Sequence, residues 1–411
     1  MELKKYKLGD LCTFINGRAY LQPELQNSGK YKIVRVGNLS GGNNSWYYSD
    51  MELEPTKYCA KGDLLYAWAC NFGPYIWKGD KTIYHYHIWK VINSDQIDKM
   101  YLYYLLKFMT NSFMGCVHGS TMLHITKENM ESMEVRIHAS IEEQRRIATI
   151  LNKLDCKIGL NRQINDNLEA MAKQLYDYWF VQFDFPNEEG KPYKSNGGAM
   201  VYNEKLKREI PQGWHCYELN KWLEIKSGFA FKSETYISKG KFKVVTIKNV
   251  QDHHLDTSSC DYVYEIPQGM KEWCSLSVND RLISLTGNCG RLCIVTEKDL
   301  LLNQRVGLLA CNNEYIDYAY LLLSSEEYQT LSNNLAKGAA QANLSPVDLC
   351  KNIAVLPKLD VLEKFNRQIK PIVASSIQNE IQIAELTKQR DELLPLLMNG
   401  QATVNYHLSA C

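Results

Sequence analysis

One segment occurs twice in the chain, as Gly29-Lys30-Tyr31-Lys32-Ile33-Val34 and, 211 residues later, as Gly240-Lys241-Phe242-Lys243-Val244-Val245. Both versions are rich in residues that favour strands and have turn-forming residues nearby, which predicts strands at 32–36 and 243–247. The same offset joins Gly17 to Gly228 and Asn38 to Asn249 without a gap. A repeat this long is no solenoid, so the chain contains one domain-sized unit twice.

The match continues after six residues that only the second copy contains. The paired segments are Gly62-Asp63-Leu64-Leu65 with Asn279-Asp280-Arg281-Leu282, Asn71-Phe72-Gly73 with Asn288-Cys289-Gly290, Tyr101 with Tyr318, and Gly119 with Gly338. Asp63 and Asp280 are expected to cap or turn the backbone. Each copy then predicts a helix (98–110 and 317–331), a glycine-led loop (115–121 and 336–341) and a last strand (133–138 and 352–357).

A long helix is predicted after each copy, because apolar residues recur at alternating spacings of four and three. From Ile141 to Phe180 there is no proline and a single glycine, and about 40 helical residues would span about 60 Å. We expect the two helices to pack antiparallel as a spacer, rather than each against a globular domain. The expected seam comprises Ile147, Leu151, Leu154, Ile158, Asn161, Asn165, Leu168, Leu175 and Trp179, and then Phe365, Ile369, Ile372, Ser376, Asn379, Ile383, Leu386, Leu393 and Leu397.

Two features of these helices leave alternatives open. The seam is polar in the middle of both helices, which either fixes their register or leaves a hydrated centre. Pro371 either kinks the second helix or marks a late start.

Composition and net charge limit the classes of protein to which this chain can belong. The 411 residues are 45% hydrophobic and carry a net charge of +1, so any nucleic acid would be bound by local basic patches. The 13 cysteines form no Cys-x-x-Cys pair, which favours reduced thiols and a cytoplasmic location. No apolar run approaches the roughly 20 residues that cross a membrane.

Motifs for catalysis are missing or weak. The sequence contains neither the Pro-Pro pair of an amino-methyltransferase tetrad nor a Gly-x-x-x-x-Gly-Lys-Ser/Thr phosphate loop. Glu224-Ile225-Lys226 matches a nuclease tripeptide, but its counterpart, Thr13-Phe14-Ile15, has no charge, so we interpret it as surface positions on a strand. His85-Tyr86-His87 and His253-His254 lack partners at metal-site spacing, so we expect no metal, no cofactor and no catalytic residue in this chain.

The linker and the chain's ending carry a family resemblance. The motifs are Phe183-Asp184-Phe185-Pro186, Gly190-Lys191-Pro192-Tyr193-Lys194, Ile210-Pro211-Gln212-Gly213-Trp214, Gly338 to Ser345, and Leu393-Leu394-Pro395-Leu396-Leu397-Met398-Asn399-Gly400. With the repeated domains and helices, the chain resembles the specificity subunit of type I restriction–modification enzymes over about residues 6–400.

The resemblance implies an α+β fold in which two mixed α/β target-recognition domains are separated by an antiparallel coiled coil, with pseudo-twofold symmetry. Its implied boundaries are 1–140 and 214–358 for the domains, 141–182 and 359–400 for the helices, 183–213 for the linker, and 401–411 for a tail. Each domain would read half of a bipartite, asymmetric site in double-stranded DNA, while the helices set the half-site spacing.

The resemblance also implies partners. Two modification subunits, which carry S-adenosylmethionine and methylate adenine N6, would dock on the helices, and restriction subunits would add nuclease and translocase activity. There are two alternatives. The chain is the specificity subunit of a related modification-only or fused system, or it is a coiled-coil scaffold that does not read DNA.

Matched positions in the two copies predict where DNA would be touched, since phosphates attract cations and base edges attract forked or amide side chains. The first copy offers Arg18, Tyr20, Arg35, Asn38, Asn71, His85, His87, Ser120 and Thr121. The second copy offers Lys232, Thr246, Lys248, Asn249, Asn288, Arg291, Gln304, Arg305 and Gln341.

Overall fold

The computed structural model describes residues 2–39, 45–69, 71–115, 126–338 and 341–403, without the side chains of residues 111–115. Two compact units emerge from the contacts between residues, and each contains one copy of the repeat. Unit 1 comprises residues 1–158 and 385–411, and unit 2 comprises residues 159–384. Both long helices cross from one unit to the other. Within the described part of the chain, no helix is long and apolar enough to span a membrane.

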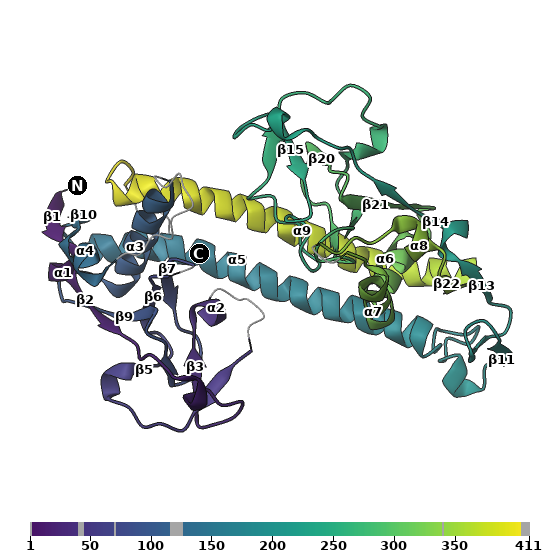
Figure 1. The fold of residues 1–411 in the computed structure, drawn as a ribbon, viewed down its shortest axis with the longest axis horizontal. Coiled ribbons are helices and arrows are strands. Elements are labelled where there is room, and N and C mark those ends of the chain that lie inside the picture. Colours follow the sequence, from purple (N-terminus) through teal and green to yellow (C-terminus); the bar gives the residue numbers. More distant parts are fainter. Residues whose placement is uncertain (1, 40–44, 70, 116–125, 339–340, 404–411) are drawn as a thin grey trace. The chain divides into compact units, whose positions relative to one another are not determined.

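The first copy consists of two four-stranded sheets and a two-stranded ribbon (Figure 1). The sheets have the strand orders β2-β9-β6-β7 and β4-β3-β8-β5, and the ribbon pairs β1 with β10. The first sheet is antiparallel, whereas β3 and β8 of the second run parallel. The strands are β1 (Leu3–Lys7), β2 (Cys12–Asn16), β3 (Tyr31–Val34), β4 (Tyr47–Ser49), β5 (Tyr58–Cys59), β6 (Leu64–Ala67), β7 (Gly73–Ile76), β8 (Thr82–Tyr84), β9 (Ile88–Asn93) and β10 (Glu134–His138).

The second copy repeats this topology strand for strand. Its sheets have the orders β14-β21-β18-β19 and β16-β15-β20-β17, its ribbon pairs β13 with β22, and β15 and β20 are the parallel pair. The strands are β13 (His215–Glu218), β14 (Leu223–Ser227), β15 (Phe242–Val245), β16 (Asp261–Val263), β17 (Ser275–Leu276), β18 (Arg281–Ser284), β19 (Leu292–Ile294), β20 (Leu300–Leu302), β21 (Val306–Cys311) and β22 (Ile353–Leu356). The duplication seen in the sequence is therefore a duplication of fold.

Strand register refines the position of the six extra residues. Tyr31 pairs with Ser49 in the first copy, and Phe242 pairs with Val263 in the second. The offset between the copies thus grows from 211 at β3 to 214 at β4, so about half of the insertion precedes β16. The insertion is divided between two loops and is not a single event in one of them.

Besides the strands, each unit contains helices that are shorter than the two long ones. They are α1 (Leu8–Leu11), α2 (Val36–Leu39), α3 (Lys99–Gly115) and α4 (Lys127–Ser132) in unit 1, and α6 (Ile316–Ser324), α7 (Glu326–Leu335) and α8 (Pro346–Cys350) in unit 2. The expected single helix over 317–331 is wrong, because the helix breaks at Ser325. This residue has extended backbone angles, and its hydroxyl caps α7 by accepting from the backbone N–H of Tyr328.

The two long helices are α5 (Ile141–Tyr176), which continues into the π-helical turn η3 (Asp177–Val181), and α9 (Leu359–Met398). α9 passes through Pro371 and begins 12 residues before it, so a late start at this proline is wrong. Between α5 and the second copy, the linker forms the hairpin of β11 (Met200–Asn203) and β12 (Arg208–Pro211).

Segments of α5 and α9 pack antiparallel within each unit. In unit 1, Arg390 Nη1 donates to Asp155 Oδ1 at 2.8 Å, and Ile147 and Leu151 share a buried cluster with Leu394 and Leu397. His138, three residues before α5, has its Nε2 2.8 Å from the Leu397 carbonyl. In unit 2, Asn161 Nδ2 donates to Gln382 Oε1 at 2.7 Å. The ring of Trp179 lies 5.6 Å from that of Phe365. In both units residue numbers rise along α5 as they fall along α9.

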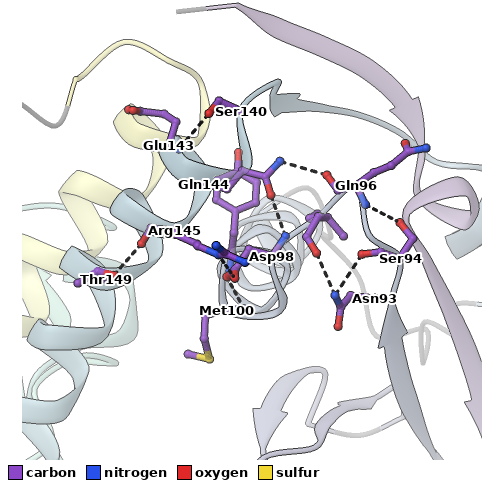
Figure 2. Close-up of polar contacts among 12 residues, drawn as sticks. Asn93, Ser94, Gln96, Asp98, Met100, Ser140, Glu143, Gln144, Arg145 and Thr149 are labelled. Atoms are coloured by element: carbon purple, nitrogen blue, oxygen red, sulfur yellow. Dashed lines mark hydrogen bonds and ion pairs between the residues drawn. The ribbon is translucent and has the colours of Figure 1, made fainter.

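Gln144 ties the first turn of α5 to the first copy (Figure 2). Its fully buried amide accepts from the Asp98 N–H at 2.8 Å and donates to the carbonyls of His138 (2.8 Å) and Gln96 (3.3 Å). Asp98 in turn caps α3, because its Oδ1 accepts from the N–H groups of Met100 and Tyr101. One buried amide therefore joins the start of α5 to the start of α3.

Candidate nucleic-acid interface

Arg18 and Tyr20 of the first copy form a half-buried cluster rather than free contacts. Both terminal nitrogens of Arg18 donate to the Glu24 carboxylate, at 2.7 and 3.1 Å, and its guanidinium lies 5.2 Å from the Tyr20 ring. The Tyr20 ring stacks on His85 at 6.3 Å, and burial raises the pKa of the Tyr20 phenol. Arg18 is thus already neutralised by Glu24 in this structure.

His85 and His87 lie in the connection between β8 and β9, among aromatic rings. Burial, assisted by the charges of His87 and Arg35, lowers the pKa of His85 to about 4, so this ring is neutral at pH 7. His87 packs edge-on against Trp68 at 5.1 Å. Tyr86, between the two histidines, is exposed. Neither Tyr86 nor Trp68 is among the positions that the sequence predicts to touch DNA, although Tyr86 is the repeat counterpart of Gln304.

Asn38 and Asn249 perform the same structural task in the two copies. Asn38 Oδ1 accepts from the Arg35 N–H at 3.1 Å, and Asn249 Oδ1 accepts from the Thr246 N–H at 2.8 Å. Asn249 is fully buried, and its Nδ2 donates to the Asp256 carbonyl at 2.9 Å. A DNA contact by Asn249 is therefore incompatible with this structure, in which the residue closes the turn after β15.

The other candidates in these two turns are more accessible. Arg35 is half-buried, lies 4.4 Å from the Tyr47 ring and donates to the Ser45 carbonyl at 2.7 Å. Thr246 is half-buried, and its hydroxyl donates to Asn249 Oδ1 at 2.8 Å. Lys248 is exposed and pairs with Asp261 at 3.2 Å.

Several polar candidates of the second copy gather around the end of β18. Leu285, just beyond this strand, donates its N–H to the Arg305 carbonyl at 2.9 Å and accepts from the Leu344 N–H at 2.8 Å. Arg305 Nη1 lies 3.4 Å from Gln341 Oε1, which joins two exposed side chains from different loops. Gln304 is exposed beside them. This surface offers amide donors and acceptors with a guanidinium, the groups that read base edges.

Three further candidates of the second copy stand apart from that group. Asn288 is exposed. Arg291 is half-buried and held by Gln251 Oε1 (3.1 Å) and Asp252 Oδ1 (3.3 Å). Lys232 is exposed and lies 3.9 Å from Glu234. In the first copy Asn71 is exposed, whereas Ser120 and Thr121 lie outside the described residues.

The eighteen seam residues are buried or half-buried, and none is exposed. The polar centre lies in unit 2, where Asn165 Nδ2 donates to Glu380 Oε1 at 2.8 Å. Asn379 Nδ2 donates to Asn165 Oδ1 at 2.9 Å. These polar groups are bonded to one another across the helix pair, as expected of a layer that fixes register.

The residues considered for catalysis or metal binding have structural partners. Glu224 and Lys226 lie on β14, on the face opposite the buried Ile225, and pair at 3.6 Å, as expected for surface positions on a strand. His253 Nε2 lies 3.0 Å from Glu169, and His254 Nδ1 lies 3.2 Å from Glu380. The described residues contain no group of three or more side chains arranged to hold a metal ion.

Asp63 and Asp280 each close the turn before a buried strand. Asp63 Oδ2 accepts from the Ala60 N–H and Asp280 Oδ2 from the Ser277 N–H, both at 2.8 Å. The expectation that these aspartates cap or turn the backbone is confirmed.

Comparison with known proteins agrees with this architecture. Residues 1–170 and 211–388 match the family described as the type I restriction modification DNA specificity domain. The specificity subunit of the type I restriction enzyme MjaIX from Methanocaldococcus jannaschii is 30% identical over 324 residues, 76% of this chain and 71% of that protein. The MjaVIII specificity subunit from the same organism is 28% identical over 426 residues, covering 97% of this chain and 92% of its own length.

A solved structure supports the fold. The S subunit of the type I restriction–modification system from M. genitalium aligns over 96% of both chains with a TM-score of 0.56, at 17% identity. With the family match over both copies of the repeat, the chain belongs to the type I restriction–modification DNA specificity family.

Proposed function

We propose that this chain is the DNA-reading subunit of a type I restriction–modification complex, in which each copy of the repeat reads one half of a bipartite, asymmetric site. One observation carries the proposal: the copies share a strand order but differ in exposed side chains. The loop between β8 and β9 presents Tyr86, whereas the loop between β20 and β21 presents Gln304 and Arg305. Two domains with the same strand order but different exposed side chains are suited to a DNA site whose two halves differ in sequence.

The paired helices supply the second part of the proposal. Helix pairing in each unit is antiparallel, and hydrogen bonds such as that from Asn161 to Gln382 favour one register. A fixed register would fix the distance between the two reading domains, and so the spacing of the half-sites. We propose that the helices also dock two modification subunits, with restriction subunits joining the complex.

The chain itself would perform no chemistry. The methyl donor S-adenosylmethionine would be bound by the modification subunits, which would methylate adenine N6. The absence of a phosphate loop and of a methyltransferase tetrad from the sequence supports this division of labour.

Methylome sequencing of a host with and without the gene tests the proposal. We expect one bipartite N6-methyladenine motif to disappear on deletion and to return when the gene is supplied with its modification subunit. If no motif depends on the gene while the modification subunit is expressed and active, the proposal fails. A coiled-coil scaffold predicts that outcome, together with no sequence-dependent DNA affinity.

A further inference from the structure

The connection between β8 and β9 and its counterpart between β20 and β21 have the same hydrogen-bonded backbone. We call residues 85–87 and 303–305 the two tips. The matched N–H to carbonyl bonds are Gly17 to Ile88 (3.1 Å) with Gly228 to Val306 (3.2 Å), Arg18 to Tyr84 (3.1 Å) with Phe229 to Leu302 (2.8 Å), His85 to Val34 (2.9 Å) with Asn303 to Val245 (3.0 Å), Tyr86 to Arg18 (3.0 Å) with Gln304 to Phe229 (2.9 Å), Ile88 to His85 (3.0 Å) with Val306 to Asn303 (3.0 Å), and Trp68 to His87 (3.1 Å) with Leu285 to Arg305 (2.9 Å). Each tip is therefore fixed by the same six bonds.

The side chains on this common backbone have different chemistry. At the first tip, Tyr86 is 38% exposed and its ring lies 3.9 Å from that of His87. Trp68 supports them, because its Nε1 donates to the Tyr86 carbonyl at 2.8 Å. At the second tip, Gln304 and Arg305 are both exposed.

Rigid backbone with exposed side chains is what a base-reading element needs, because side chains are then held in a defined geometry. An exposed glutamine amide matches the N6 and N7 groups of adenine, and an arginine fork matches O6 and N7 of guanine. Gln341 also orients the guanidinium of Arg305 from a neighbouring loop, at 3.4 Å. The second tip thus carries the hydrogen-bonding groups for a purine edge in the major groove.

The first tip has no guanidinium or amide side chain. Its surface consists of the Tyr86, His87 and Trp68 rings, beside the half-buried His85. Rings of this kind contact thymine methyl groups or bases by apolar contact and stacking.

Resting on the proposed function, we propose that the two tips are the specificity-determining elements of the two halves. Gln304 and Arg305 read a purine in one half-site by hydrogen bonds, and Tyr86 and His87 read the other half-site through ring contacts. Exchange of side chains at a tip then changes one half of the recognised sequence and leaves the other half intact.

The test uses the full chain, expressed with its modification subunit in a host that lacks other adenine methylation. The Gln304→Ala/Arg305→Ala and Tyr86→Ala/His87→Ala double variants are compared with wild type by methylome sequencing. We expect each variant to relax its own half-site, with methylation of sites altered at one base pair rising about tenfold or more, while the other half stays unchanged. Gln304→Tyr/Arg305→His, which places the side chains of Tyr86 and His87 on the second tip, should change that half-site rather than merely relax it.

Lys61→Ala and Lys239→Ala alter exposed residues of the first and second copies that do not belong to the tips, and they should leave the motif unchanged. The thermal unfolding midpoint and copurification with the modification subunit identify any variant that fails to fold or assemble. An unchanged motif in both folded tip variants overturns this inference, even if deletion of the gene still abolishes the motif. If, instead, no methylated motif depends on the wild-type gene, the proposed function itself is overturned.

Discussion

Gly17 and Gly228 are matched residues at which no side chain fits, because in each copy a backbone carbonyl of the adjacent tip lies too close to the position of a Cβ atom. A Cβ on Gly17 would lie 2.3 Å from the His85 oxygen, and one on Gly228 would lie 2.5 Å from the oxygen of its counterpart Asn303. The preceding carbonyl oxygens, of Tyr84 (2.4 Å) and Leu302 (2.3 Å), are as close. Contacts this short with backbone are not relieved by rotation of a side chain. The requirement for glycine here is therefore one of space.

Gly17→Ala and Gly228→Ala should each lower the free energy of unfolding by about 1–3 kcal/mol or more, because the tip must move to accommodate the methyl group. Urea denaturation of the full chain measures this loss. Gly159→Ala is the matched control: nothing lies within 4 Å of its Cβ, it is helical, and alanine should stabilise it slightly. Equal effects of all three substitutions would contradict the argument.

Gln144→Ala should destabilise the junction between α5 and the first copy. The substitution removes three hydrogen bonds and leaves the buried His138 carbonyl and the partly buried Asp98 N–H without this partner. We expect a loss of about 2–4 kcal/mol in the free energy of unfolding, from thermal or urea denaturation.

Thr149→Ala is the control for Gln144, since its hydroxyl donates within the same helix to the Arg145 carbonyl and the residue is exposed. Its effect should stay within about 0.5 kcal/mol. A Gln144→Ala variant as stable as Thr149→Ala would show that the buried amide does not tie α5 to α3.

Much of the fold follows from the sequence because each element of the repeated unit occurs twice, so that the two copies can be compared. The match of Tyr31 with Phe242 located the same strand twice, and the spacing of Ile147, Leu151 and Ile158 identified a buried helix face. The break at Ser325 could not be foreseen in this way, because one hydroxyl cap decides it and the first copy has a continuous helix there.

The candidate site was harder to predict because accessibility depends on tertiary partners. Asn249 has the residue type of a base reader, yet it is buried in a turn. Arg18 is bound by Glu24 six residues away. Tyr86 has neither an amide nor a guanidinium, and only its position opposite Gln304 in the matched tips indicates a role for it.

The buried ion pair between Arg281 and Asp317 should behave as a unit. Arg281 Nη2 donates to Asp317 Oδ1 at 2.5 Å, and both residues are almost fully buried, at the start of β18 and in the first turn of α6. Asp317→Leu or Arg281→Met alone leaves an uncompensated buried charge and should cost about 3–5 kcal/mol. The double variant should recover most of this loss.

A double-mutant cycle by urea denaturation measures the coupling between Arg281 and Asp317. If the double variant loses as much free energy of unfolding as the two single variants together, the two charges are stabilised independently. Far-UV circular dichroism confirms that the variants compared are folded.

His254 and Glu380 make a pH-dependent contact between the loop after β15 and α9. The hydrogen bond with Glu380 raises the pKa of His254 above 6.5, against burial and the charge of Arg162, while Asp256 also raises it. Burial alone would raise the pKa of Glu380, but the hydrogen bonds from His254 and Asn165 outweigh it and lower the pKa below 4.5.

The His254 contribution to stability is complete below pH 6.5 and is lost as pH rises through its raised pKa. The Glu380 contribution is complete above pH 4.5 and is lost as pH falls through its lowered pKa. The free energy of unfolding of the wild type should therefore exceed that of His254→Gln by the largest amount between about pH 4.5 and 6.5. Because half of the His254 side chain is exposed, the difference should be no more than about 1 kcal/mol. Unfolding of both proteins from pH 4 to 9 checks the profile, with Glu380→Gln as the reciprocal variant. A difference that grows above pH 7 would exclude an ionic contact.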